Sequence, residues 1–137
     1  MRNTEKRRIR EAGFTIMELA AVLGIIAVLA AFSVPTYNAL RRRAYEAEAR
    51  TFIQEIRVAA WEYYLENGTW PQDLTLTKLG YTEPYKSKYF TYSISVASDG
   101  KSVTITADGI DTTPAANIIV TGTLNNNGEW TVVVTYQ

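Results

Sequence analysis

One carboxylate, that of Glu18, lies near the start of a long apolar run in this 137-residue chain. It is the only ionisable side chain between residues 14 and 34. A charged carboxylate is costly in hydrocarbon unless a cation meets it, because hydrocarbon offers no water to solvate the charge. The position of Glu18 therefore predicts an ion pair with a positively charged group.

Few other side chains offer catalytic chemistry. The sequence has no histidine and no cysteine, which removes the commonest nucleophiles, general bases and zinc ligands. Asp108 and Asp111 resemble half of a calcium site, but two acids are too few, so we interpret them as solvated turn residues. We therefore predict that the chain is not an enzyme and that it has no catalytic residue, no metal site and no cofactor.

Residues 14–34 are long and apolar enough to cross a membrane. As a helix, 21 residues extend roughly 30 Å, which is the thickness of the hydrocarbon core. Five basic residues against two acidic ones precede this run, and a positive flank favours the cytoplasmic side. We therefore expect one membrane pass with the N-terminus in the cytoplasm.

The basic triplet Arg41-Arg42-Arg43 follows the apolar run and argues weakly for the opposite orientation. Three successive helical residues cover about 200° of the helix surface, so at least one arginine would point toward lipid headgroups or an adjoining subunit. A solvated collar above the membrane is the alternative. Without the basic N-terminal stretch the chain has a formal charge of −3, so nucleic acid is not an expected partner, although a local role of this triplet in DNA binding stays open.

A second helical pattern follows Pro35. Its charged residues fall largely between the apolar ones, so we expect an amphipathic helix that ends near Glu66, because Asn67-Gly68 supplies a left-handed stop. Pro35 is expected to kink the combined helix, and Gly24 is a second weak point. The apolar positions recur at steps of three and four: Tyr45, Ala49, Phe52, Ile53, Ile56, Ala60, Tyr63 and Tyr64.

The last third of the chain alternates apolar and polar residues, which predicts four strands with one buried face. Asp99-Gly100 and Asn127-Gly128 supply tight turns for two hairpins, whereas residues 108–117 form a longer connection. We predict an α+β fold: a long N-terminal helix, with a membrane-spanning half and an amphipathic half, packed on a four-stranded antiparallel sheet. The alternating apolar residues are Phe90, Tyr92, Ile94, Val96; Val103, Ile105, Ala107; Ile118, Val120, Leu124; and Trp130, Val132, Val134, Tyr136.

Residues 13–19 read Gly-Phe-Thr-Ile-Met-Glu-Leu and closely resemble the processing site of type IV pilins and type II secretion pseudopilins, Gly-Phe-Thr-Leu-Ile-Glu-Leu. The resemblance implies that residues 1–13 are a leader, that a prepilin peptidase cuts between Gly13 and Phe14, and that the new amino group of Phe14 is methylated. It also implies that Glu18 pairs with the Phe14 ammonium of a neighbouring subunit during assembly. Residues 14–35 would then be the transmembrane and assembly helix, and residues 36–137 a soluble head.

A second, looser resemblance lies in residues 63–71, Tyr-Tyr-Leu-Glu-Asn-Gly-Thr-Trp-Pro, which match a pattern common to pilins and the major pseudopilin. The resemblance implies a structural subunit of a type IV pilus, used in adhesion, twitching motility or DNA uptake. It implies copies of itself, related pilins, an inner-membrane platform protein, an assembly ATPase and, in some cells, a secretin as partners. Membrane lipid would surround the helix before assembly, and the subunit would move from the inner membrane to a surface pilus.

Three alternatives stay open at this point. A pseudopilin would form a short periplasmic pseudopilus, and the missing disulfide and the Asn-Gly-Thr-Trp-Pro segment favour it. An ordinary secretory signal would be cut near Leu29-Ala30-Ala31, and an uncleaved helix would remain as an anchor. The last two possibilities predict a secreted or membrane-anchored binding module that never enters filaments.

Overall fold

The computed structural model describes residues 13–137, so most of the predicted leader lies outside the described residues. The chain divides into two compact units, Met1–Asn38 and Ala39–Gln137, called here the N-terminal unit and the head unit. The single long helix, α1 (Ile16–Asn67), begins in the first unit and ends in the second. A helix of 52 residues agrees with the prediction of one continuous element.

Within the head unit, one face of α1 is buried by the rest of the chain. The buried residues are spaced by three or four positions, as the amphipathic pattern predicts. The helix ends one residue later than expected, at Asn67, and Gly68 follows with φ 75°, a left-handed conformation that glycine adopts without strain. The buried residues of α1 are Tyr45, Ala49, Ile53, Ile56 and Ala60.

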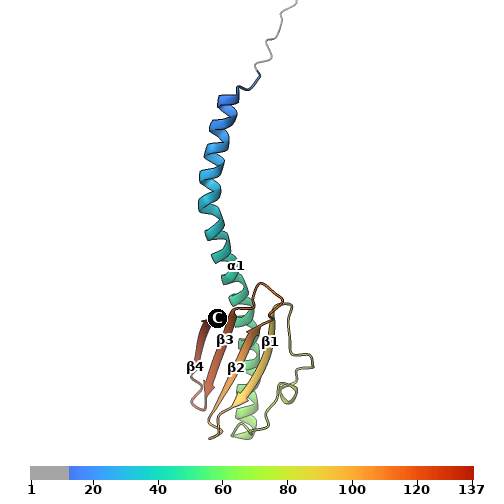
Figure 1. Ribbon diagram of the computed structural model, residues 1–137. Coiled ribbons are helices and arrows are strands. Elements are labelled where there is room, and N and C mark those ends of the chain that lie inside the picture. Colours follow the sequence, from blue (N-terminus) through green and yellow to red (C-terminus); the bar gives the residue numbers. More distant parts are fainter. Residues whose placement is uncertain (1–12) are drawn as a thin grey trace, which may run out of the picture. The chain divides into compact units, whose positions relative to one another are not determined.

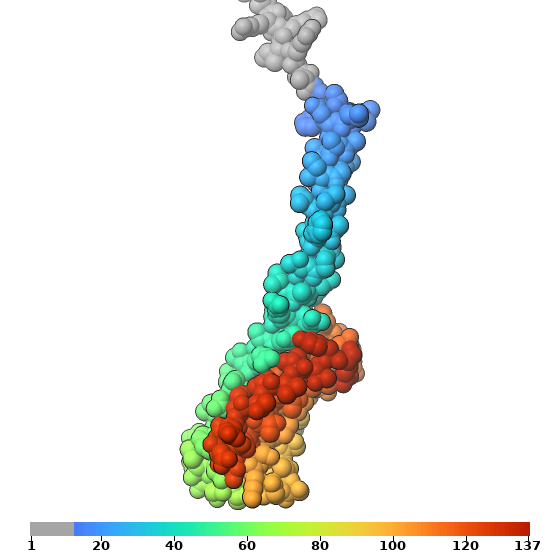
Figure 2. All heavy atoms as spheres, turned by 90° about the vertical axis from the view of Figure 1, so that its left-hand side faces the viewer, coloured from blue at the N-terminus to red at the C-terminus, as the bar shows by residue number. Residues whose placement is uncertain are grey.

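Four antiparallel strands follow, as predicted, and lie in the order β1-β2-β3-β4 (Figure 1). They are β1 (Phe90–Val96), β2 (Ser102–Gly109), β3 (Ile118–Asn125) and β4 (Trp130–Tyr136). Gly100 and Gly128 take positive φ values of 66° and 82° in the two short connections, which confirms the predicted hairpin turns. Figure 2 shows β4, in red, along one side of the head unit beside the green part of α1.

The apolar face of the sheet packs on α1 and forms the core of the head unit. Phe90, Ile105 and Val120 are fully buried and belong to one cluster with Ile53 and Ile56 of α1. The polar positions between them face outward, as the period of two predicts. The fold class predicted from the sequence is therefore confirmed.

The connection between α1 and β1 contributes buried side chains to the core. It contains one short 3-10 helix, η1 (Thr77–Leu79). Trp70 is 1% exposed, and its indole nitrogen donates a hydrogen bond of 2.8 Å to the carbonyl oxygen of Ala60. Leu74 and Leu76 are also buried, so this connection covers the end of α1 and one edge of the core.

Tyr136 differs from the other members of the predicted apolar face of β4. Its hydroxyl donates a hydrogen bond to Glu46 of α1, so its side chain lies on the expected side of the sheet. It is nevertheless 48% exposed, because it lies near the end of an edge strand where few side chains cover it. The alternation gives the correct face here but overestimates the burial.

Candidate processing and assembly site

The start of α1 is held by hydrogen bonds between Thr15 and Glu18. The backbone N–H and the side-chain hydroxyl of Thr15 each donate to Oε2 of Glu18 at 2.9 Å. The backbone N–H of Glu18 donates to the Thr15 hydroxyl oxygen at 3.2 Å. This reciprocal pattern is a capping box, which satisfies backbone N–H groups that have no partner inside the helix.

The capping box gives Glu18 a local role that our sequence interpretation missed. The signal was present, because Thr15-Ile16-Met17-Glu18 has the Thr-x-x-Glu spacing of the motif. Both Thr15 bonds go to Oε2, and within residues 13–137 no hydrogen bond to Oε1 of Glu18 is present. One carboxylate oxygen is therefore engaged within the chain, and the other is open to a partner.

The two residues of the predicted cleavage site precede α1. Gly13, Phe14 and Thr15 are not helical, and Phe14 is 80% exposed. The structure brings Thr15, rather than Phe14, into contact with Glu18. Cleavage at Gly13, methylation of Phe14 and ion pairing of Glu18 remain predictions.

The apolar side chains of residues 14–38 are uncovered. Helix α1 contains a segment with a mean hydropathy of 2.3, long and apolar enough to span a membrane, and none of that segment is buried. Exposed apolar patches of this extent are rare on soluble monomers and mark surfaces that lipid or protein covers. The large side chains on this surface include Leu19, Leu23, Ile25, Ile26, Leu29, Phe32 and Val34.

Pro35 lies inside α1, and the helix continues through it. Proline has no N–H to donate, and two nearby hydroxyls bond to backbone carbonyls: Ser33 to that of Leu29 at 2.8 Å and Thr36 to that of Phe32 at 3.2 Å. Such bonds to the preceding turn often bend helices, as the predicted kink at Pro35 would require. The kink itself remains a prediction. At Gly24 an added Cβ would meet nothing within 4 Å, so its predicted weakness rests on backbone propensity alone.

The arginine triplet lies next to an aromatic and acidic cluster in the head unit. Arg42 lies 4.0 Å from the carboxylate of Glu46 and 4.5 Å from the centre of the Tyr136 ring. The hydrogen bond to Glu46 raises the pKa of the Tyr136 hydroxyl above its ordinary value. Arg41 donates a hydrogen bond of 2.8 Å to the Tyr45 hydroxyl. Arg41 and Arg42 therefore each contact other side chains of the head unit.

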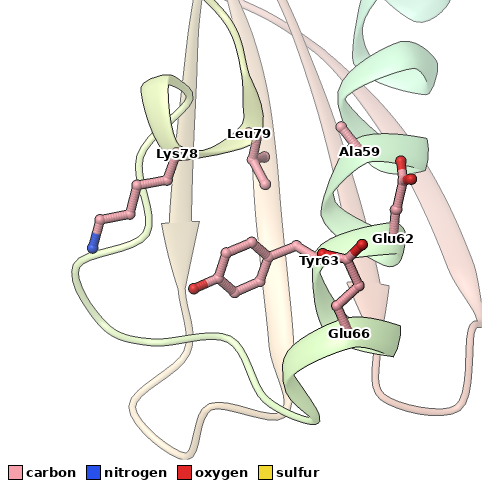
Figure 3. A pocket seen from close by; sticks show the side chains of 6 residues that line it. All are labelled: Ala59, Glu62, Tyr63, Glu66, Lys78 and Leu79. Carbon is pink, nitrogen blue, oxygen red and sulfur yellow. The ribbon is translucent and has the colours of Figure 1, made fainter.

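A shallow pocket of about 190 Å³ lies between α1 and η1. Glu62, Tyr63 and Glu66 extend from α1, whereas Lys78 points away from them (Figure 3). Lys78 instead binds Asp73 and thereby lowers the pKa of that carboxyl. No nucleophile and base are paired in this pocket, and residues 13–137 contain no group of three or more acidic, histidine or cysteine side chains suited to a metal ion.

Comparison with known proteins identifies relatives of this chain. Over 79 residues, which are 58% of this chain and 47% of the relative, the chain is 37% identical to the type IV major pilin protein PilE of Neisseria gonorrhoeae. It is 31% identical over 101 residues to a fimbrial protein of Neisseria meningitidis, covering 74% of this chain and 59% of the relative. It is 27% identical over 99 residues to the type IV major pilin protein PilA of Myxococcus xanthus, covering 72% and 44%.

The chain spans about half the length of the curated relatives it matches. No solved structure matches it. The family model for pilins, proteins of bacterial filaments, matches residues 43–137, which include the C-terminal part of α1 and the whole sheet. This match covers most of the chain and agrees with the prediction that the protein is structural rather than enzymatic. The chain belongs to the pilin family.

Proposed function

We propose that this chain is the structural subunit of a type IV pilus. The observation that carries the proposal is the combination of a head unit that matches pilins with a membrane-length apolar segment of α1 that is not buried. The curated relatives are named as type IV major pilins and fimbrial proteins. Lipid would cover the apolar helix before assembly, and copies of the same helix would cover it in the filament.

The proposal includes removal of residues 1–13 by a prepilin peptidase and methylation of Phe14. The residues around the scissile bond are not helical and are exposed, so the backbone is accessible to a protease that binds extended chain. Gly13 has no side chain to obstruct such binding. Residues 14–35 would then form the membrane and assembly helix, and residues 36–137 the soluble head.

Glu18 would connect storage and assembly. Its Oε2 atom caps the helix within the subunit, and its Oε1 atom would accept a hydrogen bond from the Phe14 ammonium of a neighbouring copy. An ion pair inside an apolar bundle neutralises two charges that would each be costly alone. Packing of small and branched side chains along α1 would supply the remaining attraction between subunits.

The cellular route follows from the same proposal. The precursor would lie in the inner membrane with its N-terminus in the cytoplasm. A platform protein, an assembly ATPase and, in a cell with an outer membrane, a secretin would serve polymerisation. The mature subunit would end in a filament at the cell surface.

Deletion of this chain tests the function. We expect deletion cells to lose surface filaments in electron micrographs and the wild-type gene to restore them. A Gly13→Val variant should remain unprocessed in the envelope and restore nothing, whereas Gly24→Ala should restore filaments. Unchanged filaments in the deletion strain would contradict the pilus proposal, and short envelope-bound filaments with a defect in protein export would favour the pseudopilus.

A further inference from the structure

The face of α1 opposite the sheet carries two columns of opposite charge. Arginine recurs every seven residues along one flank, and glutamate recurs every seven residues along the other. Each glutamate lies five positions after an arginine, which places the columns about 140° apart on the helix surface. The arginine column is Arg43, Arg50 and Arg57, and the glutamate column is Glu48, Glu55 and Glu62.

Uncharged residues fill the strip between these columns, which we call the outer seam. Its members alternate in steps of three and four, the spacing of the contact positions in a coiled coil. Val58 is 64% exposed and Leu65 is 68% exposed, although both are apolar. The outer seam consists of Ala47, Thr51, Gln54, Val58, Trp61 and Leu65.

Five members of the outer seam are exposed and lie away from the face that the sheet buries. The sixth, Trp61, is half-buried and packs at the edge of the head core, where it stacks on Tyr64. The sheet-facing residues Ile53, Ile56 and Ala60 are fully buried at helix positions opposite the seam. In heptad terms, the seam occupies the two central contact positions, and arginine and glutamate occupy the two flanking positions that select a partner. Helix α1 therefore has one face for its own sheet and a second face with the pattern of a helix partner.

The charge order selects a parallel partner of the same sequence. In a parallel pair, each residue of the arginine column meets the residue five positions later on the partner helix. Every such pair here joins an arginine to a glutamate: 43 with 48, 50 with 55, and 57 with 62. Two-fold symmetry forms each pair twice.

We propose that two copies of this chain pair in parallel through the outer seam while they are stored in the membrane. The membrane sets the register, because two copies with their apolar segments at the same depth bring identical head positions to the same height. The proposal thus rests on the membrane storage proposed above. Polar Thr51 and Gln54 in the middle of the seam keep the pair weak, which leaves it reversible when subunits move into a filament.

Arg50 and Glu55 are the most informative members of the columns. Glu48 already accepts a hydrogen bond from Ser87 at 2.8 Å, and Arg57 donates one to Gln54 at 3.1 Å. Arg50 and Glu55 are exposed and form no hydrogen bond or ion pair within residues 13–137. Reversal of either charge therefore breaks no hydrogen bond or ion pair of the folded subunit.

Cysteine crosslinking of the full chain in membranes tests the pair. The sequence has no cysteine, so Val58→Cys introduces a unique thiol at a seam position that faces its own copy in register. We expect mild oxidation to give disulfide-linked dimers. A Thr131→Cys control, exposed on the outer face of β4, should give far fewer. Equal crosslinking of the two variants, or none from Val58→Cys, would overturn the proposal.

Charge reversal in the Val58→Cys background tests the columns. Arg50→Glu and Glu55→Arg should each lower the crosslinked fraction about fivefold, since each brings like charges together twice, and the double variant should restore it. Lys101→Glu and Glu83→Arg make the same changes in net charge at exposed sites off α1 and should change nothing. A double reversal that is no better than the single ones would overturn the pairing of the columns.

Failure of the proposed pair can be distinguished from failure of the pilus proposal. If membrane crosslinks form and follow the charge pattern but the deletion strain keeps its filaments, the pair stands and the filament role fails. If deletion abolishes filaments but the membrane crosslinks are missing, the filament role stands and the pair fails.

Discussion

Ile26 and Ile53 belong to the same helix, yet Ile26 is 54% exposed and Ile53 is fully buried. The difference lies in their surroundings, because the sheet covers the helix in the head unit and none of the described residues covers it in the N-terminal unit. Burial of an isoleucine side chain contributes about 1.5–3 kcal/mol. The head unit obtains this stabilisation from its own chain, whereas the N-terminal unit depends on lipid or other subunits for it.

The polar groups of the two units also differ in how fully they are engaged by the same chain. Trp70 and Tyr136 in the head unit bond to Ala60 and Glu46 of the same chain. Within residues 13–137, Glu18 of the N-terminal unit has only Thr15 as a side-chain partner, and that contact uses one of its two carboxylate oxygens. Folding and assembly are therefore assigned to different residues, and substitutions should separate them.

The largest effect on folding is expected from Phe90→Ala. Phe90 is fully buried between α1 and the sheet, so its truncation should lower the free energy of unfolding by about 3–5 kcal/mol. Ile26→Ala should change it by less than about 0.5 kcal/mol. Denaturant unfolding of the detergent-solubilised chain can be followed by tryptophan fluorescence, because all three tryptophans lie in the head unit. Equal losses in the free energy of unfolding from the two variants would contradict the proposed difference between the units.

The largest effect on assembly is expected from Glu18→Val. Loss of one member of a buried ion pair costs about 3 kcal/mol or more, which corresponds to a reduction of roughly a hundredfold in filament yield. Processing at Gly13 and the unfolding of the head unit should be unchanged.

Thr15→Val is the control for Glu18, because it removes the capping hydroxyl and keeps the carboxylate. We expect it to lower the yield only slightly, since loss of an N-cap costs about 1 kcal/mol. An equal loss of filaments from the two variants, measured as sheared protein, would show that Glu18 acts as a cap rather than as an ion-pair partner.

Glycine substitutions sharpen the comparison at a smaller scale. A Cβ at Gly122 of β3 would overlap the Trp130 ring, so Gly122→Ala should lower the free energy of unfolding by about 2 kcal/mol. Gly24→Ala in the N-terminal unit meets open space and should leave that free energy unchanged. A tolerated Gly122→Ala would show that the sheet can shift away from Trp130.

The smallest effect concerns the contact between Tyr136 and Glu46. The folded state raises the pKa of Tyr136 above about 10, its value in an unfolded chain. The contact therefore stabilises the head unit below that pH, and its contribution is lost as the pH rises through the raised pKa. Tyr136→Phe should be slightly less stable than wild type at pH 8, and the difference should shrink above pH 10. A difference that does not depend on pH would exclude this hydrogen bond as its cause.

The sequence predicted the sheet well because alternation depends on one short period. Phe90, Ile105 and Val120 lie on the buried face for this reason. It did not predict the burial of Trp70 and Leu76, because the connection after α1 has no period and its packing depends on contacts distant in the sequence. Tyr136 was placed on the correct face but is half exposed, since alternation contains no information about strand order.

At the candidate site, the apolar run and the lone carboxylate were readable from residue type alone. The Thr-x-x-Glu spacing also indicates the capping box. The unusual charge in an apolar run favoured the ion-pair interpretation of Glu18 over this simpler local role. Ser33 and Thr36 were not expected to bond to the carbonyls beside Pro35, because these bonds follow from helical geometry rather than from composition.

The most direct test of the account is the identity of the N-terminal peptide in sheared filaments. Mass spectrometry of the sheared fraction and of the remaining envelope would locate the first residue of this chain in each. The account predicts a peptide that begins at Phe14 with a methylated amino group in the sheared fraction. A chain that begins at Met1 or near Ala31, or that is missing from the sheared fraction, would contradict it.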